Sequence, residues 1–427
     1  MKIEGDKMSQ YDLKIVGEVK QDEYLSLKSY IDILSVDDKL TVTIEDSKEK
    51  STSEFSEILE KNGLTKISHD TCGNNAYKMT YKRKKWNILA VYFAVYDIIN
   101  WKFIILKEWN IMNKNCVIGI DMGGTKISTA LADLNGRVLS KCTIPTNAIE
   151  GEEAVLARII STIDRVMKEA GKAPVNVKAI GVGSPGPLDS KNGLILNTPN
   201  LPFENFNIVQ PIENRYNVPT YLDNDANVAA IGEFMLGEGV GTQNMLYVTV
   251  STGIGGGAIL NGKIYRGHTS NALEVGHMTI VENGNKCNCG NYGCAEAHAS
   301  GTAIGRQGRE AVDRAEETSL KNYSNVTSYE VFKEAEKGDK VSKDILDKSL
   351  NYLGICVANL VAIFDPEVIV IGGGVSKGGQ IVFDKIREVV DKRCFKSMAE
   401  SCKIVPAGLG IEAGVLGAVA LAIIESK

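Results

Sequence analysis

One ten-residue stretch decides the fold: Val117-Ile-Gly-Ile-Asp121-Met-Gly-Gly-Thr-Lys126. Its first four residues predict a buried strand, which ends at a carboxylate followed by two glycines. Because glycine has no Cβ, backbone N–H groups can approach an anion there, and the threonine and lysine add further donors. The stretch therefore predicts a phosphate-binding loop, with an ordinary hairpin turn as the alternative.

Two more apolar strands along the chain end in glycine turns. Residues 245–250 are followed by Ser251-Thr-Gly-Ile-Gly-Gly-Gly257, and residues 368–371 by Gly372-Gly-Gly-Val-Ser376. Apolar residues at helical spacing predict helices over 155–166 and 350–364. Each turn alone could be structural, but three turns after apolar strands favour a nucleotide cleft at the strand ends of an α/β sheet.

Two further clusters of polar residues suggest chemistry. In Leu222-Asp-Asn-Asp-Ala-Asn227 a carboxylate could accept the proton of an attacking hydroxyl, or the segment could be a polar turn with helix-capping residues. His277, Cys287, Cys289 and Cys294 lie within 18 residues, in a chain with four histidines and nine cysteines. This is the Cys₃His set of a closed structural zinc site, with buried thiols as the alternative.

Together these motifs resemble the ROK family (repressors, open reading frames and sugar kinases), which has the actin-like ATPase fold. The resemblance covers residues 112–427, and the pattern Cys-x-Cys-Gly-x-x-Gly-Cys-x-Glu over 287–296 is the zinc signature of that family. It implies an α/β fold of the ribonuclease H-like type with two lobes. The small lobe would span about 112–228 plus the C-terminal helix, and the large lobe about 229–410.

The resemblance also implies roles for individual residues. Asp225 matches the catalytic base, and Gly186 lies in a loop similar to the substrate loop of the family. The implied sugar contacts are Gly186, Asn200, Asn224, Asp225, Glu274, His277 and Glu296, although Asn200 fits a turn after proline equally well. The implied ATP contacts are Asp121, Gly123, Gly124, Thr125, Lys126, Thr252, Gly253, Gly373 and Gly374. Zinc would order the sugar pocket through His277, Cys287, Cys289 and Cys294, while ATP and Mg²⁺ serve phosphoryl transfer.

The overall composition argues against several classes of protein. The formal net charge of −5 disfavours nucleic acid as the main partner, because phosphate binding needs a positive surface. The first thirty residues carry many charges and lack the apolar core of a secretory signal. We therefore expect a cytoplasmic protein with reduced cysteines and no membrane partner, and the resemblance implies a homodimer.

Residues 1–84 have a different composition and predict a small α+β domain of unknown function. Alternating apolar residues indicate strands near 40–44 and 77–81, and apolar residues at 55–59 indicate a helix capped by Ser51, Thr52 or Ser53. Residues 85–111 form an aromatic-rich connecting segment with all three tryptophans, and its longest apolar run is too short for the roughly 20 residues of a membrane span. A true fusion, or two reading frames joined through a translated spacer, would both explain this extension.

The expected activity is that of an ATP-dependent glucokinase, which the resemblance favours. Kinases for fructose or N-acetylhexosamines share nearly the same motifs, and pocket shape separates them. A sugar-responsive ROK repressor is the alternative from another class, but residues 1–84 contain no recognisable helix-turn-helix pattern.

Overall fold

The computed structural model describes residues 10–16, 39–45, 49–61, 63–71, 76–83, 114–198 and 201–427. The chain divides into two compact units, Met1–Lys107 and Glu108–Lys427. The aromatic-rich segment at 85–111 and the predicted sugar contact Asn200 lie outside the described residues.

The first unit contains a four-stranded sheet and one described helix. The sheet has the order β1-β2-β4-β3, in which only β1 and β2 run parallel. Its core joins alternating strand residues such as Val42 and Ile44 to Phe55 and Leu59 of the helix, all buried. The elements are β1 (Gln10–Val16), β2 (Lys39–Glu45), α2 (Glu49–Lys61), β3 (Leu64–Thr71) and β4 (Tyr77–Arg83).

The predicted cap of α2 is wrong. The helix begins at Glu49, so Ser51, Thr52 and Ser53 lie within it and not before it. Glu49 and Lys50 are residue types with a high intrinsic helix propensity. These two residues therefore extend the helix beyond the hydroxyl residues that resemble a cap.

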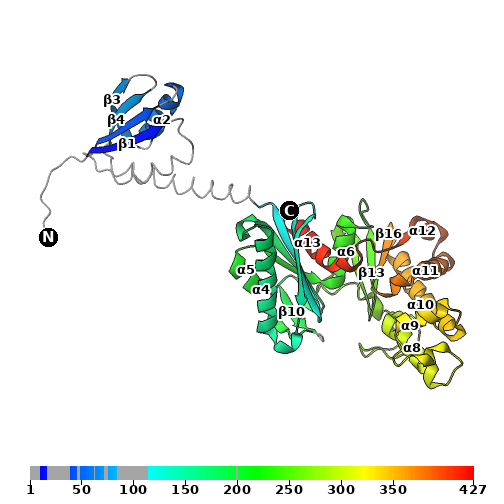
Figure 1. Cartoon of the computed structure of the whole chain (residues 1–427). Helices are drawn as coiled ribbons and strands as arrows, with labels where there is room; N and C mark the ends of the chain where they lie inside the picture. Colours follow the sequence, from blue (N-terminus) through cyan, green and yellow to red (C-terminus); the bar gives the residue numbers. More distant parts are fainter. Residues whose placement is uncertain are drawn as a thin grey trace. The chain divides into compact units, whose positions relative to one another are not determined.

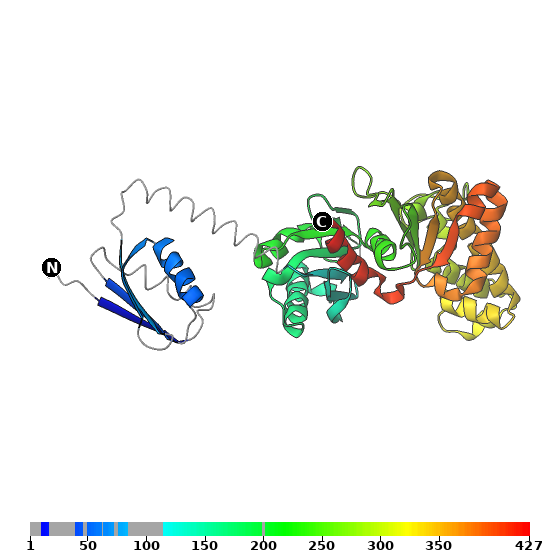
Figure 2. The same ribbon diagram turned by 90° about the horizontal axis from the view of Figure 1, so that it is seen from above.

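The second unit has two lobes (Figures 1 and 2). Each lobe is built on a five-stranded mixed sheet. The strand orders are β12-β8-β5-β6-β7 and β17-β16-β13-β14-β15, so the two sheets have the same topology. In each sheet, the first two strands along the chain form an antiparallel hairpin. The last two strands run parallel to the first strand and lie on the side of it that faces away from the second. The predicted two-lobed α/β fold is confirmed.

The small lobe packs α4 and α5 on one face of its sheet and α13 on the other (Figure 1). A short second sheet, β11-β10-β9, projects from it. Its elements are β5 (Cys116–Met122), β6 (Lys126–Asp133), β7 (Val138–Pro145), α4 (Glu152–Glu169), β8 (Val177–Ser184), β9 (Leu188–Asp189), β10 (Leu194–Asn197), β11 (Glu204–Asn207), α5 (Val209–Tyr216), β12 (Thr220–Asn224) and α13 (Ala413–Glu425).

Most helices of the large lobe cover the face of its sheet that is turned away from the small lobe. Helix α10 is long and apolar enough to cross a membrane, but more than half of its apolar window is buried, so it is a core helix. The elements are α6 (Asp225–Leu236), β13 (Met245–Val250), β14 (Ile254–Leu260), β15 (Lys263–Ile264), α7 (Ala295–Ala299), α8 (Gly301–Asp313), α9 (Ser328–Glu336), α10 (Lys340–Phe364), β16 (Val368–Gly372), α11 (Gln380–Arg393), α12 (Lys396–Ser401) and β17 (Lys403–Pro406).

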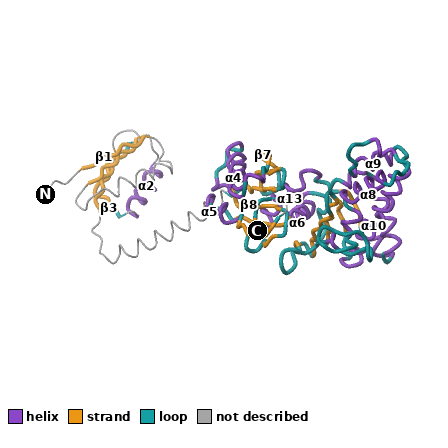
Figure 3. The backbone as a smooth tube through the Cα atoms, turned by 90° about the horizontal axis from the view of Figure 1, so that it is seen from below, coloured by secondary structure: helices purple, strands orange, loops and turns teal. Residues whose placement is uncertain are grey.

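Helices α6 and α13 lie side by side between the two sheets (Figures 1 and 3). Glycines allow this close packing. A Cβ on Gly417 of α13 would lie 2.1 Å from the carbonyl oxygen of Val228 in α6. On the other side of α13, a Cβ on Gly181 of β8 would lie 2.2 Å from the carbonyl oxygen of Ala418. The N-terminus of α6 therefore sits where the two lobes meet, and it carries the Asn224-Asp225 pair.

Candidate active site

The first predicted phosphate loop is the tight hairpin between β5 and β6. The Gly123 N–H donates to the Lys126 carbonyl at 3.0 Å and the Thr146 hydroxyl to the Gly123 carbonyl at 2.6 Å, so this turn is fixed. Because the Gly123 N–H is used inside the turn, Gly124 and Thr125 are left at its tip to meet an anion. The pKa of Asp121, at the base of the hairpin, is raised because burial disfavours the charged carboxylate. The nearby Lys126 offsets only part of this effect.

The second and third glycine loops lie together in the large lobe. A Cβ on Gly373, which has φ +88°, would lie 2.3 Å from the Val250 carbonyl oxygen, so only glycine fits there. A Cβ on Gly253 would lie 2.3 Å from the carboxylate of Glu296. These glycines are therefore needed because the loops pack closely against neighbouring segments. An isolated glycine turn would not have this requirement.

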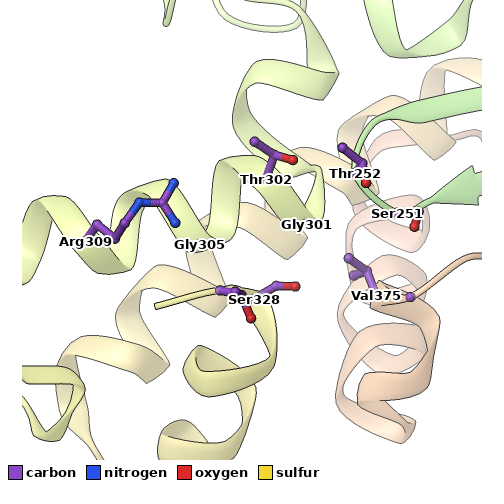
Figure 4. A pocket seen from close by; sticks show the side chains of 10 residues that line it. Ser251, Thr252, Gly301, Thr302, Gly305, Arg309, Ser328 and Val375 are labelled. Carbon is purple, nitrogen blue, oxygen red and sulfur yellow. The ribbon is translucent and has the colours of Figure 1, made fainter. Parts of the chain in front are cut away.

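A cavity of about 310 Å³ opens beside these two loops (Figure 4). Hydroxyl side chains from the loop after β13 and from helices α8 and α9 line this cavity, and Arg309 reaches toward it from α8. Thr252 and Gly374 were predicted from the sequence, whereas the contributions of α8 and α9 were missed because they belong to no glycine loop. The lining residues are Ser251, Thr252, Gly301, Thr302, Gly305, Arg309, Thr327, Ser328, Gly374 and Val375. Its size and its polar lining suit a nucleoside.

The predicted base, Asp225, is the first residue of α6. Asn224 caps this helix by accepting the Ala226 N–H at 2.9 Å, and the Asp225 carboxylate accepts the same N–H at 2.8 Å. The carboxylate opens onto solvent but is otherwise surrounded by protein. Burial, followed by the charges of Asp121 and Glu274, raises the pKa of Asp225 to about 6. A carboxylate with this pKa is suited to accept a hydroxyl proton near neutral pH.

Gly186 lies beside the helix cap, as a sugar-contact loop would require. A Cβ on this glycine would be 3.2 Å from the Asn224 side-chain nitrogen. The structure thus brings Gly186, Asn224 and Asp225 together at the ends of neighbouring parallel strands β8 and β12.

The residue before this pair, Asp223, is the centre of a buried network that the sequence analysis missed. Its side chain is completely buried, and its Oδ1 accepts the Asn224 N–H at 2.8 Å and the Asn227 amide at 2.9 Å. Its Oδ2 accepts from Nε of Arg266 at 2.7 Å. Arg266 is 43 residues away in sequence, so no local pattern could have revealed the pair.

The four predicted zinc ligands converge at one place. Their ligand atoms all lie within 4.8 Å of one another. The Sγ atoms of Cys289 and Cys294 are 3.7 Å apart, and Cys287 Sγ is 3.6 Å from His277 Nδ1. Tetrahedral zinc with Zn–S bonds of about 2.3 Å places two thiolates about 3.8 Å apart, so this donor set fits the metal.

The cysteine cluster is joined to both the predicted sugar contacts and the second glycine loop. The other ring nitrogen of His277, Nε2, lies 3.9 Å from Glu274 Oε2. Glu296 accepts the Ile254 N–H at 3.0 Å through one oxygen, and its other oxygen lies 3.9 Å from Cys287 Sγ. Nearby, buried His298 accepts the Asn285 N–H at 3.0 Å and so supports the cysteine loop, a role that the sequence analysis did not give it.

A model of the ROK family matches residues 117–425. The chain belongs to the ROK family. This match spans both lobes and every site residue described above. It begins after the first unit of the chain, so it says nothing about residues 1–107.

The relatives that match this chain include glucokinases and xylose repressors. A glucokinase of Halalkalibacterium halodurans is 35% identical over 311 residues, which cover 72% of this chain and 94% of that protein. A xylose repressor of Caldicellulosiruptor bescii is 33% identical over 310 residues, which cover 72% of this chain and 78% of the repressor. Among solved structures, a ROK glucokinase from Streptomyces griseus in complex with glucose and AMPPNP has a TM-score of 0.60 and 31% identity, covering 72% of this chain and 99% of that one.

Proposed function

We propose that this ROK protein is an ATP-dependent glucokinase that works in the cytoplasm and uses Asp225 as its general base. The observation that carries the proposal is the site of Asp225. A carboxylate with a raised pKa lies at the helix terminus where the two lobes meet, next to Asn224 and Gly186. A protein that only senses sugar needs no proton acceptor at this point, whereas a kinase does.

In the proposed reaction, the sugar lies against the residues around Asp225, and MgATP lies against the glycine loops. The 6-hydroxyl of glucose donates its proton to the Asp225 carboxylate as its oxygen attacks the γ-phosphorus. The bond between that phosphorus and the β-bridging oxygen breaks, and ADP leaves. The Gly124 and Thr125 N–H groups stabilise charge on the phosphates. Asn224, Glu274 and His277 orient the sugar hydroxyls so that the 6-oxygen is held in line.

Mg²⁺ fits the acidic side of this site. The charge of Asp121 raises the pKa of Asp225, and carboxylate oxygens are the ligands that this cation prefers. Asp121 would hold it, and the ion would neutralise charge on the transferred phosphoryl group. Zinc, held by His277 and the three cysteines, has a structural role in the proposal: it orders the loop that carries His277 and Glu296.

The direct test is an ATP-dependent phosphorylation assay on the full chain, with ADP release as the readout. Glucose, fructose, mannose and N-acetylglucosamine are compared by kcat/KM. We expect glucose to give the highest value, and Asp225→Asn to lower the activity on every sugar by about 10²- to 10⁴-fold. A higher value for another hexose contradicts the choice of glucose, and no turnover of any hexose contradicts the kinase.

A sugar-responsive repressor is the second candidate, because a xylose repressor is 33% identical to this chain. The described residues of the first unit form a four-stranded sheet and one α-helix, whereas a helix-turn-helix has two helices, of which the second enters the major groove of DNA. A gel-shift assay with the native upstream DNA, with and without xylose and glucose, distinguishes the two. Sugar-dependent binding of this DNA by a chain without kinase activity would favour the repressor.

A further inference from the structure

Arg266 connects the large lobe to two elements of the small lobe. It follows β15, and its Nε donates to Asp223 at 2.7 Å while its Nη2 donates to Glu425 at 2.6 Å. Asp223 is on β12 and Glu425 is the last residue of α13. The Asp223 side chain is fully buried, whereas the side chains of Arg266 and Glu425 are partly exposed. The contact with Asp223 is therefore the more shielded of the two ion pairs.

Asp223 in turn holds the first turn of the catalytic helix. One of its oxygens accepts both the Asn224 N–H and the Asn227 side-chain amide. The side-chain oxygen of Asn227 is buried without a hydrogen-bond partner, so the bond to Asp223 is what orients that amide. Because Asn224 and Asp225 lie within this turn, the orientation of the Asp223 carboxylate is transmitted to the base.

The backbone of Arg266 is held close to the sugar contacts of the large lobe. Its carbonyl accepts the Ala272 N–H at 3.1 Å, which closes a loop over 266–272. Ala272 is two residues before Glu274, and Leu273 between them has φ +65°, a backbone conformation that leaves little freedom. A side-chain anchor at Arg266 thus fixes the position of Glu274 as well. A second contact across the lobes, from the Ser190 hydroxyl to the Ser270 hydroxyl at 2.7 Å, holds the same loop.

We propose that Arg266 is a positioning residue that holds the sugar-binding Glu274 and the base Asp225, which directly follows strand β12 of the small lobe, at a fixed separation, through its ion pair with buried Asp223. The inference rests on the proposed function. It adds to that function an ion pair that fixes the position of Glu274 relative to Asp225. Arg266 itself is not placed in contact with the sugar or with ATP.

Arginine suits this task because its planar guanidinium carries several donors at fixed angles. Nε donates to Asp223 while Nη2 donates to Glu425, so one side chain binds β12 and α13 at the same time. Lysine retains the charge but not this geometry. Glutamine removes the charge and leaves the buried Asp223 carboxylate without a counter-ion.

The test uses the full chain with Arg266→Gln and Arg266→Lys, and measures kcat, the KM for glucose and the KM for ATP. For Arg266→Gln we expect the glucose KM to rise at least tenfold and kcat to fall at least tenfold. The ATP KM should stay within twofold, because the nucleoside cavity is lined by other loops of the large lobe. Arg266→Lys should recover part of both losses. Arg165→Gln, which removes an exposed arginine paired with Glu169, is the matched control and should leave all three values unchanged.

Folding is checked by circular dichroism and thermal melting. If Arg266→Gln does not fold, the double variant Asp223→Asn/Arg266→Met removes both charges together and should show the same selective loss toward sugar. Normal glucose KM and kcat in a folded variant of either kind overturn the proposal, as does an equal rise in the ATP KM.

A failure of the proposed function is recognised separately. If the wild-type chain binds a hexose without phosphorylating any, the kinase proposal fails but Arg266 can still be tested by calorimetry with the hexose that binds. A Kd at least tenfold weaker in Arg266→Gln then supports the positioning role, and an unchanged Kd overturns it.

Discussion

At the scale of single residues, the proposed role of Asp225 as a general base would gain activity at a cost in stability. Its pKa is higher in the folded protein than in the unfolded chain, because burial and the charges of Asp121 and Glu274 disfavour its ionised form. Its favourable contribution to folding is therefore complete below the unfolded pKa of about 3.9 and is lost as the pH rises through about 6. At pH 7 the ionised carboxylate is held in place at a cost in stability, as is common for catalytic groups.

Replacing Asp225 with Asn should therefore lower activity and raise stability. We expect turnover to fall by about 10²- to 10⁴-fold, the loss typical of a missing general base, with glucose binding retained. Since the carboxylate opens onto solvent, which screens its charge, the gain in the free energy of unfolding at pH 7 should be only about 1 kcal/mol. Steady-state kinetics, calorimetry with glucose and thermal melting measure the three effects. Near-normal turnover in this variant would show that another group is the base.

The pH dependence of the wild-type enzyme provides an independent test of the same residue. A protonated Asp225 cannot accept the hydroxyl proton, so kcat/KM for glucose should fall with unit slope below a pH of about 6. The measurement is made at low, fixed MgATP, because a bound cation would lower the pKa. The Asp225→Asn variant should lose this limb from its residual activity. A wild-type profile that is flat from pH 5 to pH 7 contradicts the assignment.

At the scale of secondary-structure elements, we expect the loop over 277–296 to depend on a metal ion for its shape. It contains few regular elements, and its three thiols and one imidazole converge as the chemistry of zinc requires. Cys289 is exposed, so its replacement leaves no cavity in the core and reports mainly on the loss of a ligand.

Cys289→Ser should lower the zinc content, lower the melting temperature and raise the glucose KM. The reason is that the loop carrying His277 and Glu296 loses the metal that orders it. Elemental analysis of the full wild-type chain should give one zinc per chain. Cys394→Ser, a half-buried thiol outside the cluster that donates to the Ala358 carbonyl, is the matched control and should keep full zinc. A wild-type protein purified gently and found without zinc would refute the role of this site.

The contact between α6 and α13 gives a prediction that the sequence alone could not supply. A Cβ on Gly417 would clash with the backbone of Val228, which belongs to a helix that is itself packed against a sheet. Gly417→Ala should therefore destabilise the second unit by about 3 kcal/mol, at the upper end of the cost of overpacking a core. Urea unfolding of the two proteins measures the difference. Equal stability would mean that the two helices can separate freely.

Patterns within one segment were predictable, and contacts between distant segments were not. The strand before Asp121 and the helix ending at Phe364 follow from hydrophobic periodicity, and the zinc cluster follows from residue types at close spacing. The Asp223–Arg266 pair and the helix contact at Gly417 arise only when the chain folds. The cap of α2 was misassigned because several residues before Phe55 could begin a helix, and local propensity does not choose among them.

At the scale of the whole molecule, the two units have different relations to the rest of the ROK family. The family match lies entirely within the second unit. The Halalkalibacterium glucokinase is covered over 94% of its length by 311 residues of this chain. A protein of that size therefore has almost nothing that corresponds to residues 1–111, so the second unit resembles a complete two-lobed protein.

Truncation to residues 112–427 should yield a folded chain with kinetic constants within a few-fold of those of the full chain. Every residue assigned to the active site lies in this span, and β5, the first strand, is buried between β6 and β8 of its own sheet. The last helix, α13, closes the same core from the other end of the chain. Kinetics, melting and size-exclusion chromatography of both lengths decide the matter. An inactive or unfolded truncation would mean that residues 1–111 are part of the working enzyme and that the boundary at 112 is wrong.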